Sequence, residues 1–373
     1  MRSEITYTDR IETVDEVMTY LMLPAEAGDV LLPPARGLHA AAVALGDSAH
    51  ADLLRMDVCH RLRRGQDVIF ASDGDPVTGY ADLLDEAAAY LETSAKLPIL
   101  AGAGDFTPER ASPLDRTAEH YGRLWGAFSP EHYFVEAAEL LHTRMSRNGI
   151  DLGWFQGKRA LDCGCGGGRY TVALKKLGFA EVVGVDWSEE ALETARWRAG
   201  DAGIEGVRYQ RANVLELPFG DDEFDFVFSN GVLMLTEDTE RGVRELLRVM
   251  KRDGRGWIYL YARPGGLDRV THYLARLLLK QANHEVCRRY CRALGLAGNR
   301  TFFLLDLWLT PIAECYTPDE VEVMLQQAGC QKWWRLTRGE DRDLVEQLNR
   351  GSFFASVKFG VGENRYFFEG KQA

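Results

Sequence analysis

The chain has 373 residues, of which 44 are Lys or Arg and 56 are Asp or Glu, giving a formal net charge of -12. This acidic balance argues against nucleic acid and against an anionic membrane surface as partners. Hydrophobic residues (46%) and charged residues (27%) stand in the proportion usual for a globular protein, and no apolar run approaches the ~18 residues of a membrane span.

The cysteines and the first residues favour a cytoplasmic protein. The seven cysteines are odd in number and scattered, which favours reduced thiols over a disulfide framework. The opening stretch, MRSEITYTDRIETVDEV, lacks the basic start, apolar core and small-residue cleavage site of a secretory signal. We therefore expect a cytoplasmic location and no membrane partner.

Residues 1–112 are predicted to form an N-terminal helical domain. Four segments repeat apolar residues at helical spacing: TVDEVMTYLML, GLHAAAVAL, HADLLRMDVCHRL and YADLLDEAAAYLE. Breaks rich in Pro and Gly lie between them. Residues 100–116 have the composition of a linker, which places the domain boundary near residue 112.

Residues 113–373 are predicted to form a second domain with an α/β fold. After two helices separated at Ser129, apolar strands alternate with amphipathic helices from RALDCG to GRGWIYLYA. Such alternation indicates a doubly wound, mostly parallel sheet with helices on both faces. Ser188 is a predicted N-cap, and Thr317 and Glu320 have the spacing of a capping box. Two final strands, QKWWRLTR and ENRYFFEGK, are expected to pair.

Residues 264–316 interrupt this alternation with helical sequence that is longer than a crossover needs. We expect a helical insertion after the fifth strand. Segments inserted near strand ends often act as lids, and extra helical packing is the alternative.

A glycine-rich turn, LDCGCGGGRYTVAL, follows the first strand and indicates a nucleotide-like ligand. The dinucleotide pattern GxGxxG fits Gly164 and Gly166 but meets Arg169 at its third position. The alternative pattern DxGxGxG is satisfied by Asp162, Gly164, Gly166 and Gly168. An aspartate at the strand end suits a ligand with a positive amino group and would repel a pyrophosphate.

The ends of the next strands add polar side chains in order. Asp186 ends the second strand, where a carboxylate can accept both hydroxyls of a ribose. Trp187 could lie against an adenine face or pack in the core. Asn213 follows the third strand, where its amide oxygen could accept from an adenine amino group. Asn230 ends the fourth strand, beside the reactive end of the ligand.

Together with VVGVDWSEEALETAR, ANVLELPFGDDEFDFVFSNGVL and LLRVMKRDGRGWIYLY, this turn resembles the successive motifs of the class I S-adenosylmethionine-dependent methyltransferases, and of their small-molecule branch in particular. The resemblance covers residues 158–262 closely and 317–370 by topology. It implies a seven-stranded sheet with an antiparallel last strand and S-adenosylmethionine at the carboxyl ends of the strands. The chain departs from the family at Asn213, usually aspartate, and at Met234-Leu235, where histidine is common.

The same resemblance implies roles for single residues. Asp162 and the glycines would hold the methionyl part of the donor, Asp186 the ribose, and Asn213 with Val214 the adenine. Arg169 could pair with the donor's carboxylate or lie on the surface. The expected cofactor contacts are Asp162, Gly164, Cys165, Gly166, Gly168, Arg169, Asp186, Trp187, Asn213, Val214 and Asn230. No metal is expected.

The implied reaction transfers a methyl group from S-adenosylmethionine to an oxygen, nitrogen or sulfur atom of a small molecule, giving S-adenosylhomocysteine. Alignment and exclusion of water matter most, and a base is needed only if the acceptor must lose a proton. His272 is the candidate base. Candidates for the substrate pocket are Tyr121, Trp125, Tyr133, Tyr261, Arg263 and Trp308, with Asp306 and Glu314 from the insertion, and ordinary packing competes at each position.

Other interpretations remain open at this stage. A methyltransferase acting on RNA or protein would need a basic or extended groove. A donor-binding module without catalysis would keep the same glycines, whereas Arg169 argues against a nicotinamide oxidoreductase. A homodimer is one arrangement that the chain could form. His284, Cys287 and Cys291 share a helix face that could hold a soft metal or arsenic with Cys315, although buried thiols are favoured.

Overall fold

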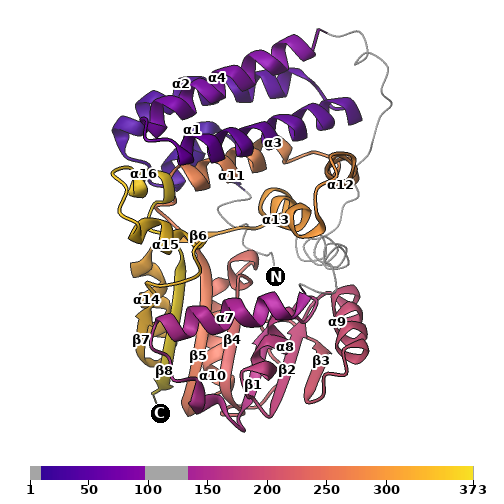
Figure 1. Cartoon of the computed structure of the whole chain (residues 1–373), viewed down its shortest axis with the longest axis vertical. Helices are drawn as coiled ribbons and strands as arrows, with labels where there is room; N and C mark the ends of the chain where they lie inside the picture. The colour runs from indigo at the N-terminus through magenta and orange to yellow at the C-terminus, as the bar shows by residue number, and fades with distance from the viewer. Residues whose placement is uncertain (1–9, 97–132, 373) are drawn as a thin grey trace.

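The computed structural model describes residues 10–96 and 133–372 and shows a twisted sheet with a helical layer above one end (Figure 1). The main path of the sheet runs in the order β3-β2-β1-β4-β5-β8-β7. Its strands are β1 (Arg159–Cys163), β2 (Glu181–Asp186), β3 (Val207–Arg211), β4 (Phe224–Asn230), β5 (Met250–Ala262), β7 (Cys330–Arg335) and β8 (Asn364–Lys371).

Strand directions confirm the predicted α/β fold. Strands β1 to β5 pair in parallel, and β8 runs antiparallel between β5 and β7. A two-residue strand, β6 (Cys315–Tyr316), was not predicted and pairs in parallel with the end of β5. The carboxyl ends of β1, β2, β4 and β5 therefore meet at one edge of the sheet, which is where ligands bind in open α/β sheets.

Helices cover both faces of the sheet because side chains alternate along each buried strand. On one face, Ala160, Phe226 and Trp257 pack against the apolar side chains of α7 and α8. On the other face, Leu161 and Val227 belong to the larger core that includes α10 and α14. The helices are α7 (Val135–Arg147), α8 (Arg169–Lys176), α9 (Glu189–Asp201), α10 (Thr239–Val249) and α14 (Pro318–Gln327).

Local capping signals in the sequence are confirmed in the structure. The Ser188 hydroxyl accepts from the backbone N–H of Ala191 at the start of α9. Thr317 and Glu320 form the complete capping box at the start of α14. Both caps satisfy N–H groups that a helix cannot pair internally.

The insertion predicted after the fifth strand consists of α11 (Gly266–Leu279), α12 (His284–Ala293) and α13 (Gly298–Leu309). The N-terminal helices α1 (Val14–Tyr20), α2 (Ala25–Ala44), α3 (Ala49–Ala71) and α4 (Pro76–Ser94) lie above it in Figure 1. Helix α3 packs on α11 and α12, and α1 also packs on α11.

Polar contacts join these helices. Gln66 donates to Asp268 over 3.1 Å, and the hydroxyls of Tyr80 and Thr271 are 2.6 Å apart. The N-terminal helices and the insertion thus pack together above the strand ends. The domain boundary predicted near residue 112 lies outside the described residues.

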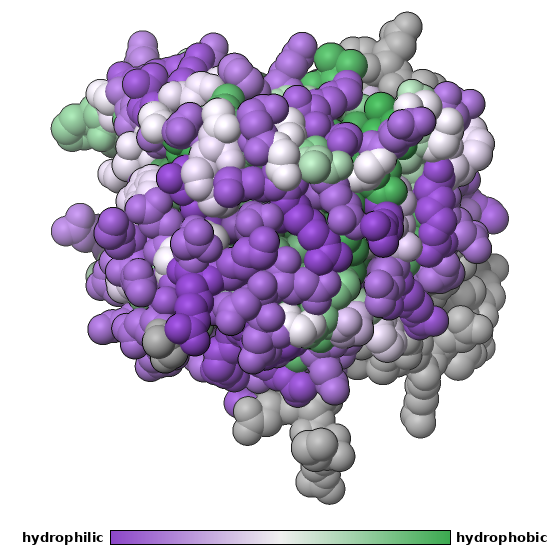
Figure 2. All heavy atoms as spheres, turned by 90° about the horizontal axis from the view of Figure 1, so that it is seen from below, coloured by the Kyte–Doolittle hydropathy of each residue, from purple (hydrophilic) through white to green (hydrophobic). Residues whose placement is uncertain are grey.

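The C-terminal segment adds two short helices between the last two strands, α15 (Leu344–Asn349) and α16 (Ala355–Phe359). Lys358 in α16 donates to the backbone oxygens of Phe70 and Ser72, which ties the end of α3 to this segment. None of the helices in the described ranges is long and apolar enough to cross a bilayer. The face of the molecule seen from below is largely hydrophilic, with smaller apolar areas between (Figure 2).

Candidate functional site

The glycine turn between β1 and α8 has a backbone that needs its glycines. Gly164, Gly166 and Gly168 have φ angles of +82°, +50° and +81°, in the left-handed region that side chains disfavour. A Cβ atom on Gly164 would lie 2.3 Å from Val232 Cγ1, and one on Gly168 would lie 2.6 Å from the Tyr209 hydroxyl. The turn is therefore held close to the sheet, and this explains the DxGxGxG pattern.

Asp162 at the end of β1 faces the turn as a buried carboxyl group. It is 2% exposed, and the Thr171 hydroxyl donates to its Oδ2 over 2.6 Å. Burial raises the pKa of Asp162 to about 7, with the neighbouring Asp186 as a further cause. A carboxyl group with a raised pKa loses its proton more readily when a cation binds beside it. Asp162 can therefore form an ion pair with the amino group expected of the ligand.

Asp186 at the end of β2 is bound to the turn itself. Its Oδ2 accepts from the N–H of Gly166 over 2.8 Å, and its Oδ1 accepts from the N–H of Ser188 over 2.9 Å. Burial raises the pKa of Asp186, while these backbone N–H groups act in the opposite direction. Each carboxylate oxygen can accept more than one hydrogen bond, so both remain able to accept from a ribose diol.

Trp187 and Asn213 lie at the neighbouring strand ends. The Arg211 guanidinium lies 4.7 Å from the centre of a Trp187 ring, and Arg211 also donates to the Trp187 carbonyl. The Asn213 amide oxygen, expected to accept from the ligand, already accepts from the N–H of Leu215 over 2.9 Å. Asn213 can therefore offer a second lone pair or its NH2 group.

These residues surround one cavity of about 610 Å³ at the carboxyl ends of the strands. Every expected cofactor contact except Gly168 lines this cavity, and so do Tyr261, His272 and Asp306. Much of the remaining wall is formed by the insertion and by the C-terminal segment, with contributions from α7 and from the segment after β4. It includes Phe302, Phe303, Leu304 and Leu307 of α13, together with Asp343, Leu344, Glu363 and Arg365.

Arg169 is buried, contrary to the alternative that it lies on the surface. It is 7% exposed, donates from Nε to the Tyr133 carbonyl over 2.9 Å, and pairs with Glu136 at 3.2 Å. Arg169 thus links the glycine turn to the start of α7, and its charge is already balanced by a carboxylate.

Several candidates for the substrate pocket do not line the cavity. The Tyr133 hydroxyl donates to the Gly167 carbonyl over 2.7 Å, so Tyr133 supports the turn from outside. Arg263 pairs with Glu320, and Trp308 is 2% exposed. Tyr121 and Trp125 lie outside the described residues.

The hydrogen bonding of His272 does not fit the predicted role of a base. The Trp308 indole N–H donates to its Nδ1 over 3.1 Å, so Nδ1 is an acceptor and the neutral ring carries its proton on Nε2. That Nε2 lies 3.8 Å from Asp268. Burial lowers the pKa of His272 to about 3. Neither nitrogen is therefore free to take a proton from a substrate.

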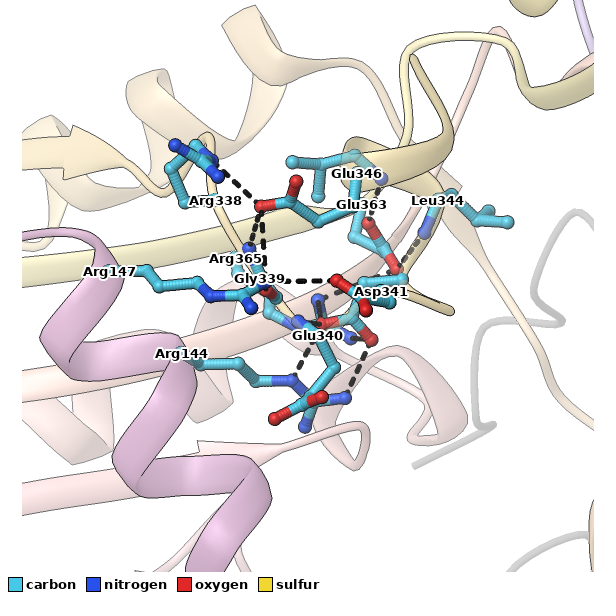
Figure 3. Close-up of polar contacts among 12 residues, drawn as sticks. Arg144, Arg147, Arg338, Gly339, Glu340, Asp341, Leu344, Glu346, Glu363 and Arg365 are labelled. Carbon is cyan, nitrogen blue, oxygen red and sulfur yellow. Dashed lines mark hydrogen bonds and ion pairs between the residues drawn. The ribbon is translucent and has the colours of Figure 1, made fainter. Parts of the chain in front are cut away.

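The polar wall formed by the C-terminal segment was missed in the sequence. Arg144 of α7 binds both oxygens of Asp343, at 2.8 and 2.7 Å, and Arg365 of β8 pairs with the same carboxylate at 3.0 Å. Figure 3 shows Arg144, Arg365 and Glu363 gathered in this polar cluster. Glu363 accepts from the N–H groups of Leu344 and Val345 at the start of α15. The sequence signal that could have indicated this polar wall is a charged residue within an apolar strand, such as Arg365 in NRYFF.

The cysteines have no feature of a metal site among the described residues. Cys287 and Cys291 are buried on α12, and burial raises the pKa of Cys287 to about 12 and that of Cys291 to about 11. No group of three or more His, Cys, Asp or Glu in the described ranges is arranged to hold a metal ion. The thiols pack as small apolar side chains.

Comparison with known proteins finds similarity to methyltransferases around this site. Residues 161–258 match the family model described as Methyltransferase domain. The chain is 31% identical over 156 residues to the uncharacterized methyltransferase YcgJ of Bacillus subtilis (strain 168), covering 41% of this chain and 61% of the relative. It is 37% identical over 106 residues to a demethylmenaquinone methyltransferase of Staphylococcus aureus (strain MRSA252), covering 28% of this chain and 43% of the relative.

A third relative is the O-methyltransferase cnsE of Penicillium expansum, 33% identical over 148 residues, covering 38% of this chain and 54% of the relative. The chain thus spans between 43% and 61% of the length of these relatives. The crystal structure of YcgJ aligns with a TM-score of 0.39 and 21% identity, covering 62% of this chain and all of that one.

Proposed function

We propose that this chain, a member of the class I S-adenosylmethionine-dependent methyltransferase family, transfers a methyl group from S-adenosylmethionine to a small molecule. The observation that carries the proposal is the cavity of about 610 Å³, which joins the glycine turn to an apolar wall on α13. A cavity of this size is typical of sites that enclose small ligands.

The residues at the turn suit this donor. The buried Asp162 carboxyl group can bind an ammonium group, and Asp186 presents two oxygens to a diol. A side chain at Gly164 would clash with Val232, so the turn can take this conformation only with glycine there. Trp187 and Val214 line the same end of the cavity and offer flat or apolar surface to a purine ring.

S-adenosylmethionine supplies a methyl group on a positively charged sulfur, which is already reactive toward nucleophiles. The protein therefore needs to orient the acceptor and to exclude water. Tyr259 and Tyr261 at the end of β5, with Leu235 after β4, form the wall beyond Asn230. Helix α13 covers this end with Phe302, Leu304 and Leu307.

The acceptor is proposed to be small because α11 and α13 of the insertion line one side of the cavity. An acidic chain with a formal net charge of -12 also offers little attraction to RNA. The printed names of two relatives, a demethylmenaquinone methyltransferase and an O-methyltransferase, support a small acceptor. Since His272 is not available as a base, an acceptor that loses its proton would do so to water or to another wall residue.

The test is transfer of a labelled methyl group. The purified chain is incubated with methyl-labelled S-adenosylmethionine and a cell extract separated into small-molecule and macromolecular fractions. We expect label in the small-molecule fraction, and at least tenfold less at limiting donor concentration when Asp186→Ala replaces the wild type. Label in protein or RNA alone would contradict the small-molecule acceptor, and no transfer to either fraction would contradict the activity.

A further inference from the structure

In the described part of the chain, seven arginines line the cavity, and six of them form an ion pair with a carboxylate, whereas Arg269 does not. Arg144 and Arg365 pair with Asp343, and Arg169 and Arg342 pair with Glu136. Arg63 and Arg300 both pair with Asp67. Among the described residues, no carboxylate lies within 4.0 Å of the Arg269 guanidinium, and its Nε has no hydrogen-bond partner. Arg269 forms a hydrogen bond with Tyr259 and interacts with Asp268 only at longer range.

Arg269 is nevertheless buried and held in position. It is 5% exposed in the first turn of α11, and its guanidinium lies 4.5 Å from the centre of the Tyr261 ring. Gly265 makes room for its side chain, since a Cβ atom there would lie 2.0 Å from Arg269 Cγ. A buried arginine without a carboxylate is costly to fold, so its retention in the cavity wall indicates a ligand.

The groups around Arg269 offset its positive charge only in part. Burial raises the pKa of Tyr259 and of Tyr261, so both hydroxyls stay neutral. The adjacent Asp268 also lines the cavity and interacts with Arg269, but it is shared with Gln66, Arg63 and His272. Asp306 of α13 also reaches Tyr261 electrostatically and raises its pKa further.

The position of Arg269 separates it from the donor residues. Asp162 and Asp186 end β1 and β2, whereas Tyr261 lies near the end of β5, with β4 between β1 and β5. Neighbouring strands are about 4.8 Å apart, so the end of β5 is about 10 Å from that of β1. The surface beside Arg269 is the apolar wall of Phe302, Leu304 and Leu307.

We propose that the methyl acceptor is an apolar small molecule carrying a carboxylate, which Arg269 binds and orients. This inference rests on the proposed function, because it assigns Arg269 to the acceptor of that reaction. A guanidinium matches a carboxylate with two parallel N–H···O bonds, which fixes orientation as well as charge. The apolar wall of α13 then receives the remainder of the acceptor.

The test is a binding comparison in the full chain saturated with S-adenosylhomocysteine. The probes are 4-fluorobenzoate and its neutral twin 4-fluorobenzamide, followed by 19F NMR. We expect the wild type to bind the acid at least tenfold more tightly than the amide. Arg269→Gln should reduce this preference to within twofold, and Arg269→Lys should keep part of it.

The control is Arg276→Gln, which changes another arginine of α11 that packs on a tyrosine, Tyr273, but does not line the cavity. It should keep the full preference for the acid. Equal binding of acid and amide by the wild type, or binding of neither, would overturn the inference. So would an unchanged preference in Arg269→Gln.

A second readout separates acceptor from donor. The affinity for S-adenosylhomocysteine should stay within twofold in Arg269→Gln, and a tenfold loss would instead assign Arg269 to the donor's carboxylate. If the wild type prefers the acid but the labelling experiment yields no labelled small molecule, the proposed function is contradicted and the binding role of Arg269 is not. Labelled products without preference for the acid would overturn the inference alone.

Discussion

At the residue scale, Asp162 should make donor binding depend on pH. Its pKa of about 7 in the ligand-free protein means that much of it is protonated near neutral pH, and a bound ammonium favours the carboxylate. Affinity for S-adenosylhomocysteine should therefore fall about tenfold from pH 8 to pH 6. Calorimetry across this range measures the slope.

The matched variant is Asp162→Asn, which keeps the shape of the side chain without its charge. It should bind more weakly and show a flat profile over the same pH range. A wild-type affinity that does not change between pH 8 and pH 6 would remove Asp162 from the ammonium site.

The geometry of the glycine turn could be predicted because its residues are close in sequence. Asp162, Gly164 and Gly168 belong to one turn, and their pattern follows from backbone geometry. Arg269 could not be found this way, since a buried arginine and an exposed one look alike in sequence. The sequence also does not show that the Trp308 indole donates to Nδ1 of His272, a hydrogen bond that argues against the proposed base.

At the scale of elements, the ion pairs of Figure 3 hold α7, β8 and the loop before α15 together. Burial opposes ionisation of Asp343, but Arg144 and Arg365 lower its pKa to about 2. Replacing Arg144 by Met removes one partner of a buried carboxylate, which costs about 3 kcal/mol of unfolding free energy. Urea unfolding at pH 7 measures this loss.

The pH dependence of that loss has a fixed sign. Because the pKa of Asp343 is depressed in the folded chain, its contribution is present above about pH 4 and is lost as pH falls toward 2. The difference between wild type and Arg144→Met should shrink in that range. Arg147→Met, which removes a partly exposed arginine that pairs with Asp341 and donates to the Gly339 carbonyl, should cost less, about 1 kcal/mol. Equal losses for the two variants would contradict the role of the buried network.

The strands β1 to β5 and the helices between them could be predicted from the sequence. Apolar residues are spaced differently in a buried strand and in an amphipathic helix, and this spacing identifies each element. The two residues of β6 and the short helices α15 and α16 carry too few residues to show a period. The packing of α3 on α11 could not be predicted either. An apolar stripe shows that a helix face is buried, but it does not show which element covers that face.

At the scale of the whole molecule, the N-terminal helices are expected to be needed for stability. Val17, Leu62 and Leu84 belong to the same apolar core as Val270 and Leu274 of α11. A chain of residues 97–373 would expose that face of α11, and exposed apolar patches promote aggregation. We expect aggregation in size-exclusion chromatography and a lower thermal midpoint. A monodisperse product with the full midpoint and full donor affinity would contradict this.

The most direct test of the account is the titration of S-adenosylhomocysteine into wild type and Asp186→Ala. We expect binding by the wild type and at least a tenfold loss in the variant, because Asp186 would no longer accept from the ribose. Asp186→Asn should be intermediate, and Asp201→Ala, exposed at the end of α9, should match the wild type. Equal affinity of wild type and Asp186→Ala would contradict the assignment of this cavity to the methyl donor.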